Sequence, residues 1–593
     1  MARLGITQGE GVTRWVELIT DADLDLMSAT LGVSTITAKV LTNRGIRSRN
    51  AAIRFLRHDR QFMYDAALLC DMGKAVNIAR KAVADRRKIT VYGDYDVDGV
   101  TSSVILLKTL RRLGAASADY YIPAREAEGY GLNKDAVKRL AETGTGLLIA
   151  CDNGISAVEE LALANELGME TIVVDHHEPA FADGPTQRAD ILPPAGAVID
   201  HKRADCSYPF KALCAAGLCY KLAVELSKAC GSPLPQELDD ELLSLAALAT
   251  VCDIVPLLDE NRVIVTNGLD ILSRGSSNLG LRTLLVARNL AGRPLTVHDA
   301  GFIIGPCINA AGRLGSAATA ADLLLAEDAK EAMLLAQRLI NLNERRKAMT
   351  EAAAERIMET VSGAGFRGKS IYLVHDPQTP EGIAGIAAGR VKDALNHPAI
   401  VFTNAAEPGV IKGSARSVTG YNVFEGLFAC RDILERLGGH AMAAGCSLRL
   451  EHLEELDRRL NASCGLTEAD FDKTLYIDGW LRPENVTFAL ANELSSLGPF
   501  GKDCHEPLFA AQSVRCESAA QIGADGKTLR FTFSAGYYKI KGIAFGIYDD
   551  VKDILKKGPM IMDIAYNIGI NDYNGERSLQ LIVRDLKVLE PGA

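Results

Sequence analysis

The sequence predicts an α/β protein built on a doubly wound, mostly parallel sheet, and three observations lead to this prediction. From about residue 61 to 325, strand-like and helix-like stretches alternate, which is typical of a parallel sheet covered by helices. A connecting helix over 326–362 is expected next, because Asp328 to Val361 contains no Gly or Pro and is rich in helix-forming residues. Beyond residue 466, strand-like runs separated by turn signals predict a small antiparallel β domain, for which a barrel is one form.

The elements follow in chain order. Residues 1–60 are expected to be helical and partly basic, and residues 363–465 to form a smaller α/β unit. The predicted strands of the large domain are "KITVYG", "GLLIAC", "TIVV" and "GAVI". Those of the C-terminal domain, 466–593, are "TLRFTFSAG", "YKIKGIAFGIY", "PMIMDIAYNIGI" and "SLQLIVRDLKVL", with "ADGK" and "NDYNGE" as turns.

Composition limits the cellular setting and the class of partner. The 593 residues suggest three or four domains, and 48% hydrophobic residues are enough for real cores. No apolar run reaches the roughly 18 residues of a membrane span, and the first residues lack a signal-peptide core. The thirteen cysteines include no Cys-x-x-Cys pair, which favours a reducing, cytoplasmic setting. With a net charge of −10, the chain needs metal ions or a local basic groove to bind a polyanion.

An acidic loop follows the first predicted strand of the large domain. In "GDYDVDG", Asp94, Asp96 and Asp98 stand two residues apart, and a helix-like stretch begins at once. The spacing resembles the front half of an EF-hand, but the twelfth position is Ile105 and a strand, not a helix, precedes the loop. Because ligands bind beyond the carboxyl ends of strands in such sheets, we expect these carboxylates to lie in a site.

Further metal-type residues stand at three other positions, which we interpret as strand ends. Asp152 follows "GLLIAC", His176 and His177 follow "TIVVD", and Asp253 follows the apolar run "LAALATVC". Carboxylates with one or two histidines suit Mn²⁺ or Mg²⁺ rather than structural zinc. So many anionic ligands predict two divalent ions, the usual device for attacking phosphate esters. Taken alone, each Asp could be a helix cap and "DHH" a polar loop, but their joint occurrence favours a metal site.

These motifs carry a family resemblance. "GDYDVDG", "ACDNG", "DHH" and "VCDIVPL", in this order, resemble the DHH phosphoesterase superfamily. "GSARS" and "GGHAMAAG" resemble its smaller DHHA1 substrate domain. "YIPAREAEGYGL", "INAAGRLG" and "LGPFGKDCHEPLF" are similar to the bacterial single-strand-specific exonucleases, and the last β segment to their oligonucleotide-binding (OB) domain. The resemblance spans about residues 60–590 and implies a DHH domain, a DHHA1-like domain and an OB-type barrel.

The resemblance implies roles for individual residues. It places metal ligands at Asp96, Asp98, Asp152, His176 and Asp253, with His177 at the scissile phosphate. Many superfamily members carry a His four positions before the residue that matches Asp96. This chain has Tyr92 there, so Asp94 is expected to supply the missing ligand.

Substrate contacts are expected outside the metal cluster. A phosphodiester needs cationic or N–H partners, and Arg125, Arg313 and Arg416 are each flanked by Gly or small residues. By resemblance, Ser414 with Arg416 forms a pocket for a terminal 5′ phosphate, and His440 of "GGHAMAAG" contacts a phosphate or base. The alternative for "GGHAMAAG" is helix–loop packing with Met442 and the alanines buried. Thr379, Pro380 and Glu381 depart from a Trp-His pair that these exonucleases often show.

The resemblance therefore implies an exonuclease that degrades single-stranded DNA from its 5′ end and releases mononucleotides, in repair and recombination. We expect a monomer whose partner is 5′-phosphorylated single-stranded DNA and which binds no membrane. Two alternatives stay open: a phosphodiesterase for short oligoribonucleotides or cyclic dinucleotides, and a non-catalytic binding protein with a decayed metal site. Aromatic residues of the C-terminal domain are expected to lie mostly in its core, so none is proposed as a stacking residue.

Overall fold

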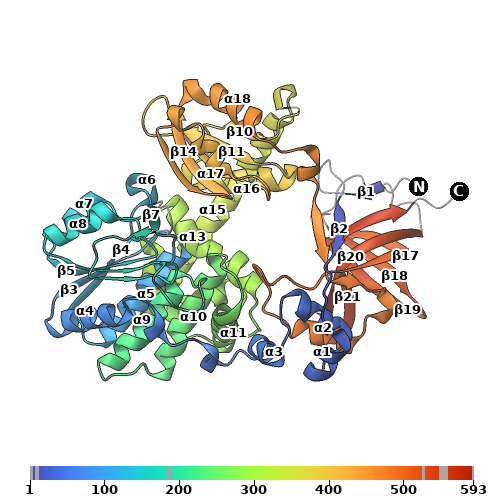
Figure 1. Cartoon of the computed structure of the whole chain (residues 1–593), viewed down its shortest axis with the longest axis horizontal. Coiled ribbons are helices and arrows are strands. Elements are labelled where there is room, and N and C mark those ends of the chain that lie inside the picture. Colours follow the sequence, from blue (N-terminus) through green and yellow to red (C-terminus); the bar gives the residue numbers. More distant parts are fainter. Residues whose placement is uncertain are drawn as a thin grey trace. The chain divides into compact units, whose positions relative to one another are not determined.

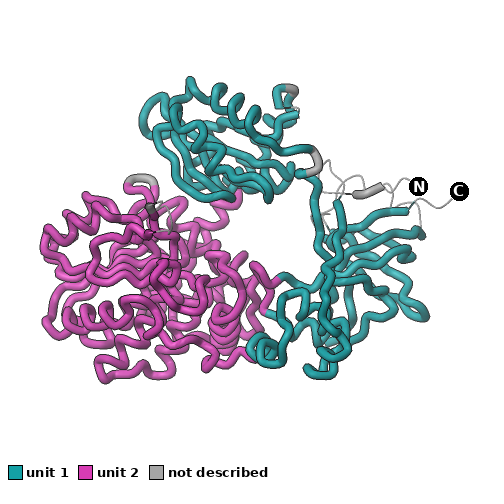
Figure 2. Tube along the Cα trace, in the orientation of Figure 1, with its two compact units in different colours: residues 1–56, 349–498, 505–593 teal, residues 57–348, 499–504 magenta. Residues whose placement is uncertain are grey.

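A computed structural model of the chain describes residues 4–6, 13–182, 189–366, 368–523, 528–545, 559–573 and 575–589. They form two compact units (Figure 2). One consists of residues 57–348 and 499–504, and the other of residues 1–56, 349–498 and 505–593. The expected turn at 524–527 lies outside the described residues.

The first unit is built on a five-stranded, fully parallel sheet in the order β4-β3-β5-β6-β9 (Figure 1). The strands are β3 (Lys88–Tyr92), β4 (Ser117–Tyr121), β5 (Thr145–Cys151), β6 (Glu170–Val174) and β9 (Ala197–Ile199). The central residues of β3, β5, β6 and β9 are buried, as expected for near-continuous apolar strands with helices on both faces, whereas the edge strand β4 is only partly buried. The predicted doubly wound fold is confirmed.

Helices position the residues that follow these strands. They include α5 (Val97–Arg112), α9 (Ala215–Ala229), α10 (Gln236–Cys252), α11 (Asp259–Arg274) and α13 (Gly305–Leu314). The strand end predicted before Asp253 is wrong, because "LAALATVC" belongs to α10 and Asp253 caps its C-terminus. The run is apolar on every side because α10 is buried from Leu242 to Val251, so it shows no amphipathic period. Helix α15 (Ala329–Val361) confirms the long connecting helix.

The DHHA1-like part of the second unit has a sheet in the order β10-β11-β12-β14-β13. Its strands are β10 (Tyr372–His375), β11 (Ala399–Asn404), β12 (Val410–Arg416), β13 (Arg436–His440) and β14 (Ala443–Arg449). "GGHAMAAG" forms the β13–β14 hairpin, so the helix–loop alternative is wrong, and Met442 is 45% exposed at its turn. Helix α16 (Glu381–Leu395) packs on β11 and β12.

The C-terminal part is a closed five-stranded barrel, in which each strand pairs with two others of the five. Its strands are β17 (Phe509–Ile522), β18 (Thr528–Ala535), β19 (Tyr538–Phe545), β20 (Met560–Tyr573) and β21 (Glu576–Leu589). The expectation that its aromatic residues are mostly core holds for Phe509, Phe531 and Phe533, which are buried. Tyr537, in contrast, is fully exposed.

Residues 1–60 are only partly helical. Helices α1 (Leu24–Leu31), α2 (Thr35–Asn43) and α3 (Arg49–Leu56) follow two short strands that the sequence did not predict. Strand β1 (Leu4–Ile6) pairs with β21, and β2 (Arg14–Glu17) pairs in parallel with β15 (Thr474–Ile477) (Figure 1). These strands depend on partners more than 450 residues away, so a local pattern cannot reveal them.

No single described helix is long and apolar enough to cross a bilayer; only α1 and α2 taken together, with a 104° bend between them, pass that length-and-composition test.

Candidate metal centre

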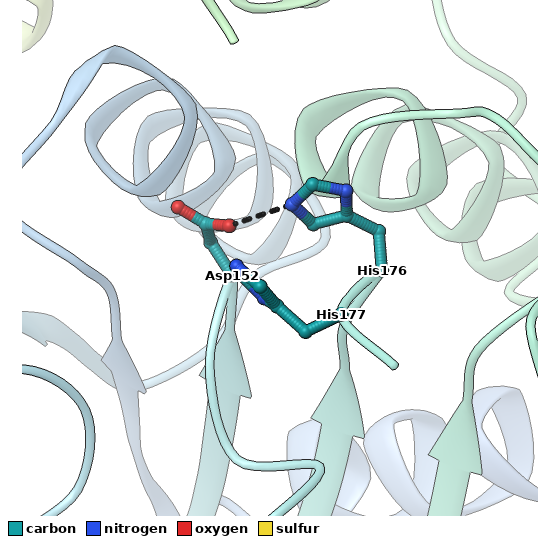
Figure 3. A group of neighbouring side chains, drawn as sticks. All are labelled: Asp152, His176 and His177. Atoms are coloured by element: carbon teal, nitrogen blue, oxygen red, sulfur yellow. Dashed lines mark ion pairs between the residues drawn. The ribbon is translucent and has the colours of Figure 1, made fainter. Parts of the chain in front are cut away.

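The carboxyl ends of β3, β5 and β6 bring the acidic and histidine residues of three motifs to one edge of the sheet. Asp152 follows β5 in a left-handed conformation (φ 62°), and Gly154 lies close beneath the loop, where a Cβ would come within 3.3 Å of Ala150 and Val173. Such a backbone turn directs the Asp152 side chain back across the strand end. Figure 3 shows Asp152 facing His176 and His177.

His176 lies at the centre of the cluster. Its Nε2 atom is 3.3 Å from Oδ1 of Asp152, 3.7 Å from Oδ2 of Asp98 and 3.8 Å from Oδ2 of Asp253 (Figure 3 draws the first). This nitrogen is buried and has no hydrogen-bond partner among the described residues. Burial, and then the charge of His177, lower the pKa of His176 to about 3. A neutral imidazole with an unpaired buried nitrogen is a typical metal ligand.

The acidic loop before α5 supplies the other side of the cluster. Asp96 caps α5, with Oδ1 accepting from the backbone N–H groups of Asp98 and Gly99 at 2.9 and 3.1 Å. Asp98 accepts from the N–H groups of Ala215 and Ala216, at the first turn of α9. Asp94 is 2% exposed, and its Oδ1 has no hydrogen-bond partner in the described chain.

The side chains fall into three groups, each of whose ligand atoms lie within 4.8 Å of one another. The groups are Asp98 with His176 and Asp253, Asp94 with Asp96 and Asp152, and Asp152 with His176 and His177. All six predicted ligands are therefore brought together. Tyr92 takes no part in these groups: it is buried, and its hydroxyl donates to the carbonyl of Gly131 at 3.0 Å.

The cluster has strongly perturbed carboxyl groups. Burial, followed by the charge of Asp96, raises the pKa of Asp98 to about 7 and that of Asp94 well above its usual value. Burial and then the charge of Asp98 raise the pKa of Asp253 to about 8 and that of Asp152 well above its usual value. Carboxylates packed this closely need positive charge, and oxygen ligands with one or two imidazoles suit Mn²⁺ or Mg²⁺.

His177 differs electrostatically from His176. Burial disfavours its charge, but the hydrogen bond between its Nδ1 and Oδ1 of Asp175 (2.7 Å) outweighs this effect and raises the pKa of His177 to about 9. Asp175 is itself fixed by the N–H of Ile155, which donates to its Oδ2 at 2.9 Å. His177 is 45% exposed at its side chain, so a positive imidazolium stands at the rim of the cluster at neutral pH.

Sequence reasoning missed Tyr130 and Asn309. The hydroxyl of Tyr130 donates to the carbonyl of Asp152 at 3.1 Å and lies 3.3 Å from the ring nitrogens of His177. Asn309 accepts from the N–H of Val97 at 3.0 Å and so fixes the start of α5. The available signal for Tyr130 was its place between two glycines, both of which have φ 79°.

Two of the predicted arginines stand beside the acidic loop. The guanidinium carbon of Arg125 is 5.0 Å from the ring centroid of Tyr95. Arg313 follows Gly312, where a Cβ would lie 2.4 Å from the carbonyl oxygen of Tyr95. Burial and then Asp94 raise the pKa of Tyr95 to about 12, and the charges of Arg125 and Arg313 oppose this rise.

The other three predicted contacts lie on one face of the DHHA1-like sheet. Ser414 is paired with Gly445, and Arg416 with Ala443, which in turn is opposite His440. Directly opposed residues of an antiparallel sheet share a face, so Ser414, Arg416 and His440 project from the same side.

The part of this face that β14 and β13 form is bare, whereas α16 lies over β12, where a Cβ at Gly385 would come within 2.9 Å of Arg416 and 3.6 Å of Ser414. Gly445 and Gly438 stand in the row that begins at Ser414. A Cβ at Gly438 would meet nothing within 4 Å, and one at Gly445 only the carbonyl oxygen of Gly413 at 3.9 Å. Packing within the protein therefore does not require glycine at either position. Close approach of a ligand to the sheet would require glycine there.

The three residues that depart from the expected Trp-His pair have structural roles. Thr379 is buried and donates to Oδ2 of Asp376 at 2.7 Å, while Pro380 directly precedes α16. Glu381, in the first turn of α16, pairs with Lys412 at 2.8 Å. Lys412 shares the face of Ser414 and Arg416, because alternate residues of a strand point the same way.

Comparison with known proteins agrees with this organisation. Family models match residues 88–250 (DHH family, N-terminal domain), 368–465 (DHHA1 domain) and 477–585 (RecJ OB domain). The single-stranded-DNA-specific exonuclease RecJ of Bacillus subtilis is 36% identical over 97% of this chain and 71% of its own length. That of Escherichia coli is 32% identical over 92% and 95%.

A solved structure extends the comparison to the fold. RecJ from Thermus thermophilus in complex with Mn²⁺ matches with a TM-score of 0.78 and 28% identity, over 98% of this chain and 80% of that one. With relatives at 32–36% identity along most of their lengths, the chain belongs to the RecJ family of the DHH phosphoesterase superfamily.

Proposed function

We propose that the chain is a metal-dependent exonuclease that degrades single-stranded DNA from its 5′ end and releases mononucleotides. The observation that carries this proposal is the gathering of five carboxylates and the buried Nε2 of His176 into overlapping ligand groups, in a chain whose relatives are named single-stranded-DNA-specific exonucleases. Activity on short oligoribonucleotides or cyclic dinucleotides is not favoured, because those relatives match almost the whole chain, including the barrel.

The ligand groups suggest how two divalent ions would be held. Asp98, His176 and Asp253 would hold one, and Asp94, Asp96 and Asp152 the other, while Mn²⁺ or Mg²⁺ suits both sets. When bound, such ions activate the attacking water and stabilise negative charge on the phosphate.

Hydrogen bonds within the protein orient the residues of this site. The N–H groups at the start of α9 fix both oxygens of Asp98, so this carboxylate does not rotate away from the cluster. His177, positively charged through Asp175, would face a phosphate oxygen of the substrate and stabilise its negative charge. The hydroxyl of Tyr130 donates to the carbonyl of Asp152 and contacts the ring of His177, and so fixes the positions of Asp152 and His177 relative to each other.

The substrate contacts are proposed from the positive charge of three arginines and from the open surface of the glycine-lined sheet face. Arg125 and Arg313 would bind phosphates beside the acidic loop. Ser414, Arg416 and His440 surround a glycine-lined sheet face on which a terminal 5′ phosphate can approach the backbone. We assign catalysis to residues 61–325, end recognition to 363–465 and strand binding to 466–593.

Two further points complete the proposal. Every proposed metal ligand comes from one chain, so a monomer is sufficient for the reaction. All thirteen cysteines are free thiols, which favours the reducing conditions of the cytoplasm.

The test uses one oligonucleotide sequence in several forms. With Mn²⁺ or Mg²⁺, a 5′-phosphorylated single strand labelled at its 3′ end should give a ladder of products shortened from the 5′ end, together with mononucleotides. Cyclic dinucleotides, short oligoribonucleotides and blunt duplex should be cut much more slowly. Equal digestion of the duplex, or shortening from the 3′ end, would contradict the proposal.

A further inference from the structure

A cavity of about 370 Å³ beside the barrel is lined by both tryptophans of the chain, Trp15 and Trp480. Trp15 comes from β2 and Trp480 from β16 (Gly479–Trp480), which pairs with β17. Their ring centroids are 6.5 Å apart and the ring planes are inclined by 48°. Residues separated by 465 positions thus form one aromatic wall.

Trp15 is held rigidly. Its indole N–H donates to Oδ2 of Asp585 at 2.7 Å, and Nζ of Lys587 stands 4.6 Å from its ring centroid. The strand that carries it is fixed by parallel pairing with β15. A prebuilt aromatic surface of this kind loses little conformational entropy when a ligand binds.

Trp480 is 48% exposed. A large aromatic surface left in water is unfavourable, and exposed tryptophans in cavities are frequent binding residues. Its strand is anchored, with Trp480 opposite Ala510 of β17, so the ring is presented from a fixed backbone.

Charge and polarity narrow the class of ligand. Arg14 and Lys587 are balanced by Asp472 and Asp563, so the cavity lining has no net formal charge. This suits a neutral planar group rather than a free phosphate. Gln512, an exposed amide on the lining, offers both a donor and an acceptor to the edge of such a group.

We propose that this cavity takes one base of a single-stranded nucleic acid, stacked on Trp480, with Arg14 at the neighbouring phosphate. The inference rests on the proposed function and adds a base-binding subsite to it. Base–aromatic stacking combined with nearby cations is the usual way of holding a single strand without sequence preference. An apolar aromatic side chain of a peptide would fill the space but has no polar ring edge to offer the amide of Gln512, whereas a base has both donors and acceptors there.

The chain offers a direct readout, because its two tryptophans both line this cavity. Full-length protein in EDTA, which prevents turnover, is titrated with 5′-phosphorylated oligothymidylates while tryptophan emission is followed. We expect saturable quenching. A strand of the same length that carries a single base and is otherwise abasic should quench the tryptophan emission only when that base stands at certain positions. Trp480→Ala should weaken binding about 5- to 150-fold, the usual range for one stacked base.

A matched control is Phe545→Ala, which removes an aromatic residue that is 64% exposed on β19 but does not line the cavity. It should leave affinity and quenching unchanged. Unchanged emission while a mobility-shift assay shows bound strand would overturn the inference, and so would quenching by an acidic aromatic peptide but not by DNA. Both binding readouts are taken without metal, and strand cleavage is measured separately with Mn²⁺ or Mg²⁺. A protein whose emission is quenched by DNA but which cuts no strand would therefore contradict the proposed function and leave this subsite standing.

Discussion

Nε2 of His176 lies 3.3 Å from Oδ1 of Asp152, and this buried nitrogen has no hydrogen-bond partner within the described chain. A buried imidazole nitrogen left unpaired costs free energy. A proton on this nitrogen could be shared with the neighbouring carboxylates. Burial and the charge of His177 oppose such a proton, because they keep the pKa of His176 at about 3. The cluster of carboxylates around His176 is therefore destabilising without a bound cation and stabilised by one. The first two predictions follow from this difference.

Asp152→Asn should separate folding from catalysis. The substitution keeps the shape of the side chain and removes one titratable group from a cluster in which burial, and then the charge of Asp98, raise the pKa of Asp152. We expect the metal-free protein to be as stable as the wild type or more so, while kcat/KM falls at least about 100-fold because the metal ligand set is weakened. Thermal unfolding and strand degradation measure the two effects. A folded variant with more than a tenth of wild-type activity would remove Asp152 from the ligand set.

The metal-free protein should lose stability as the pH rises. Asp98 and Asp253 have pKa values of about 7 and 8 in the folded chain, against about 3.9 unfolded. Between about pH 4 and 8 the folded state therefore binds more protons than the unfolded state, so the free energy of unfolding falls with rising pH. We expect the Tm in EDTA to drop by several degrees between pH 5 and pH 8.

Two comparisons isolate this effect from the rest of the titration. Asp253→Asn should make the decline shallower, because one of the titrating groups is lost. Saturating Mn²⁺ should abolish most of the decline, because the ions take the place of the protons. A decline with the same slope in all three samples would show that the cluster does not cause it.

Much of this site could be predicted because its signals are local. Asp94 and Asp96 precede α5, Asp98 lies in its first turn, and Asp152 and His176 come within two residues of the ends of buried strands, so the rule that parallel strands end at a common edge brings them together. Asp253 lies with the other predicted ligands, but the strand end from which its position was predicted is wrong. This residue caps a helix that is buried from Leu242 to Val251, and the uniform hydrophobicity of that run cannot be told from that of a buried strand.

The remainder depends on contacts that no short pattern contains. Trp15 and Trp480 meet only because a short N-terminal strand pairs with β15. Phe531 and Phe533, which the alternation of the barrel strand places inward, are core residues as expected. The aromatic residues that line a cavity were thus not the ones that a strand pattern would have selected.

The bare sheet face predicts opposite effects for two glycines of neighbouring strands. Gly445→Val adds a side chain over open space, so stability should be unchanged or slightly higher, while degradation of 5′-phosphorylated strands should fall about 10-fold or more because the phosphate is kept from the sheet. Gly413→Ala, on the opposite face, would place a Cβ 2.4 Å from the ring of Phe402. It should lower the free energy of unfolding by about 1–3 kcal/mol. Equal losses of stability would contradict this assignment of the two faces.

Arg262 should anchor the segment Pro499–Cys504 in the catalytic unit. Its guanidinium is 1% exposed, and Nη1 donates to the carbonyl of Pro499 at 3.0 Å, while the N–H of Leu257 donates to the carbonyl of Lys502 at 2.9 Å. Arg262→Met leaves the Pro499 carbonyl unsatisfied, so we expect a loss of about 2 kcal/mol in the free energy of unfolding and new tryptic cleavage after Lys502. Arg274→Met is the control on the same helix. Its ion pair with Asp270 is exposed, so both readouts should stay at wild-type values; resistance of the Arg262 variant to trypsin would show that other contacts hold the segment.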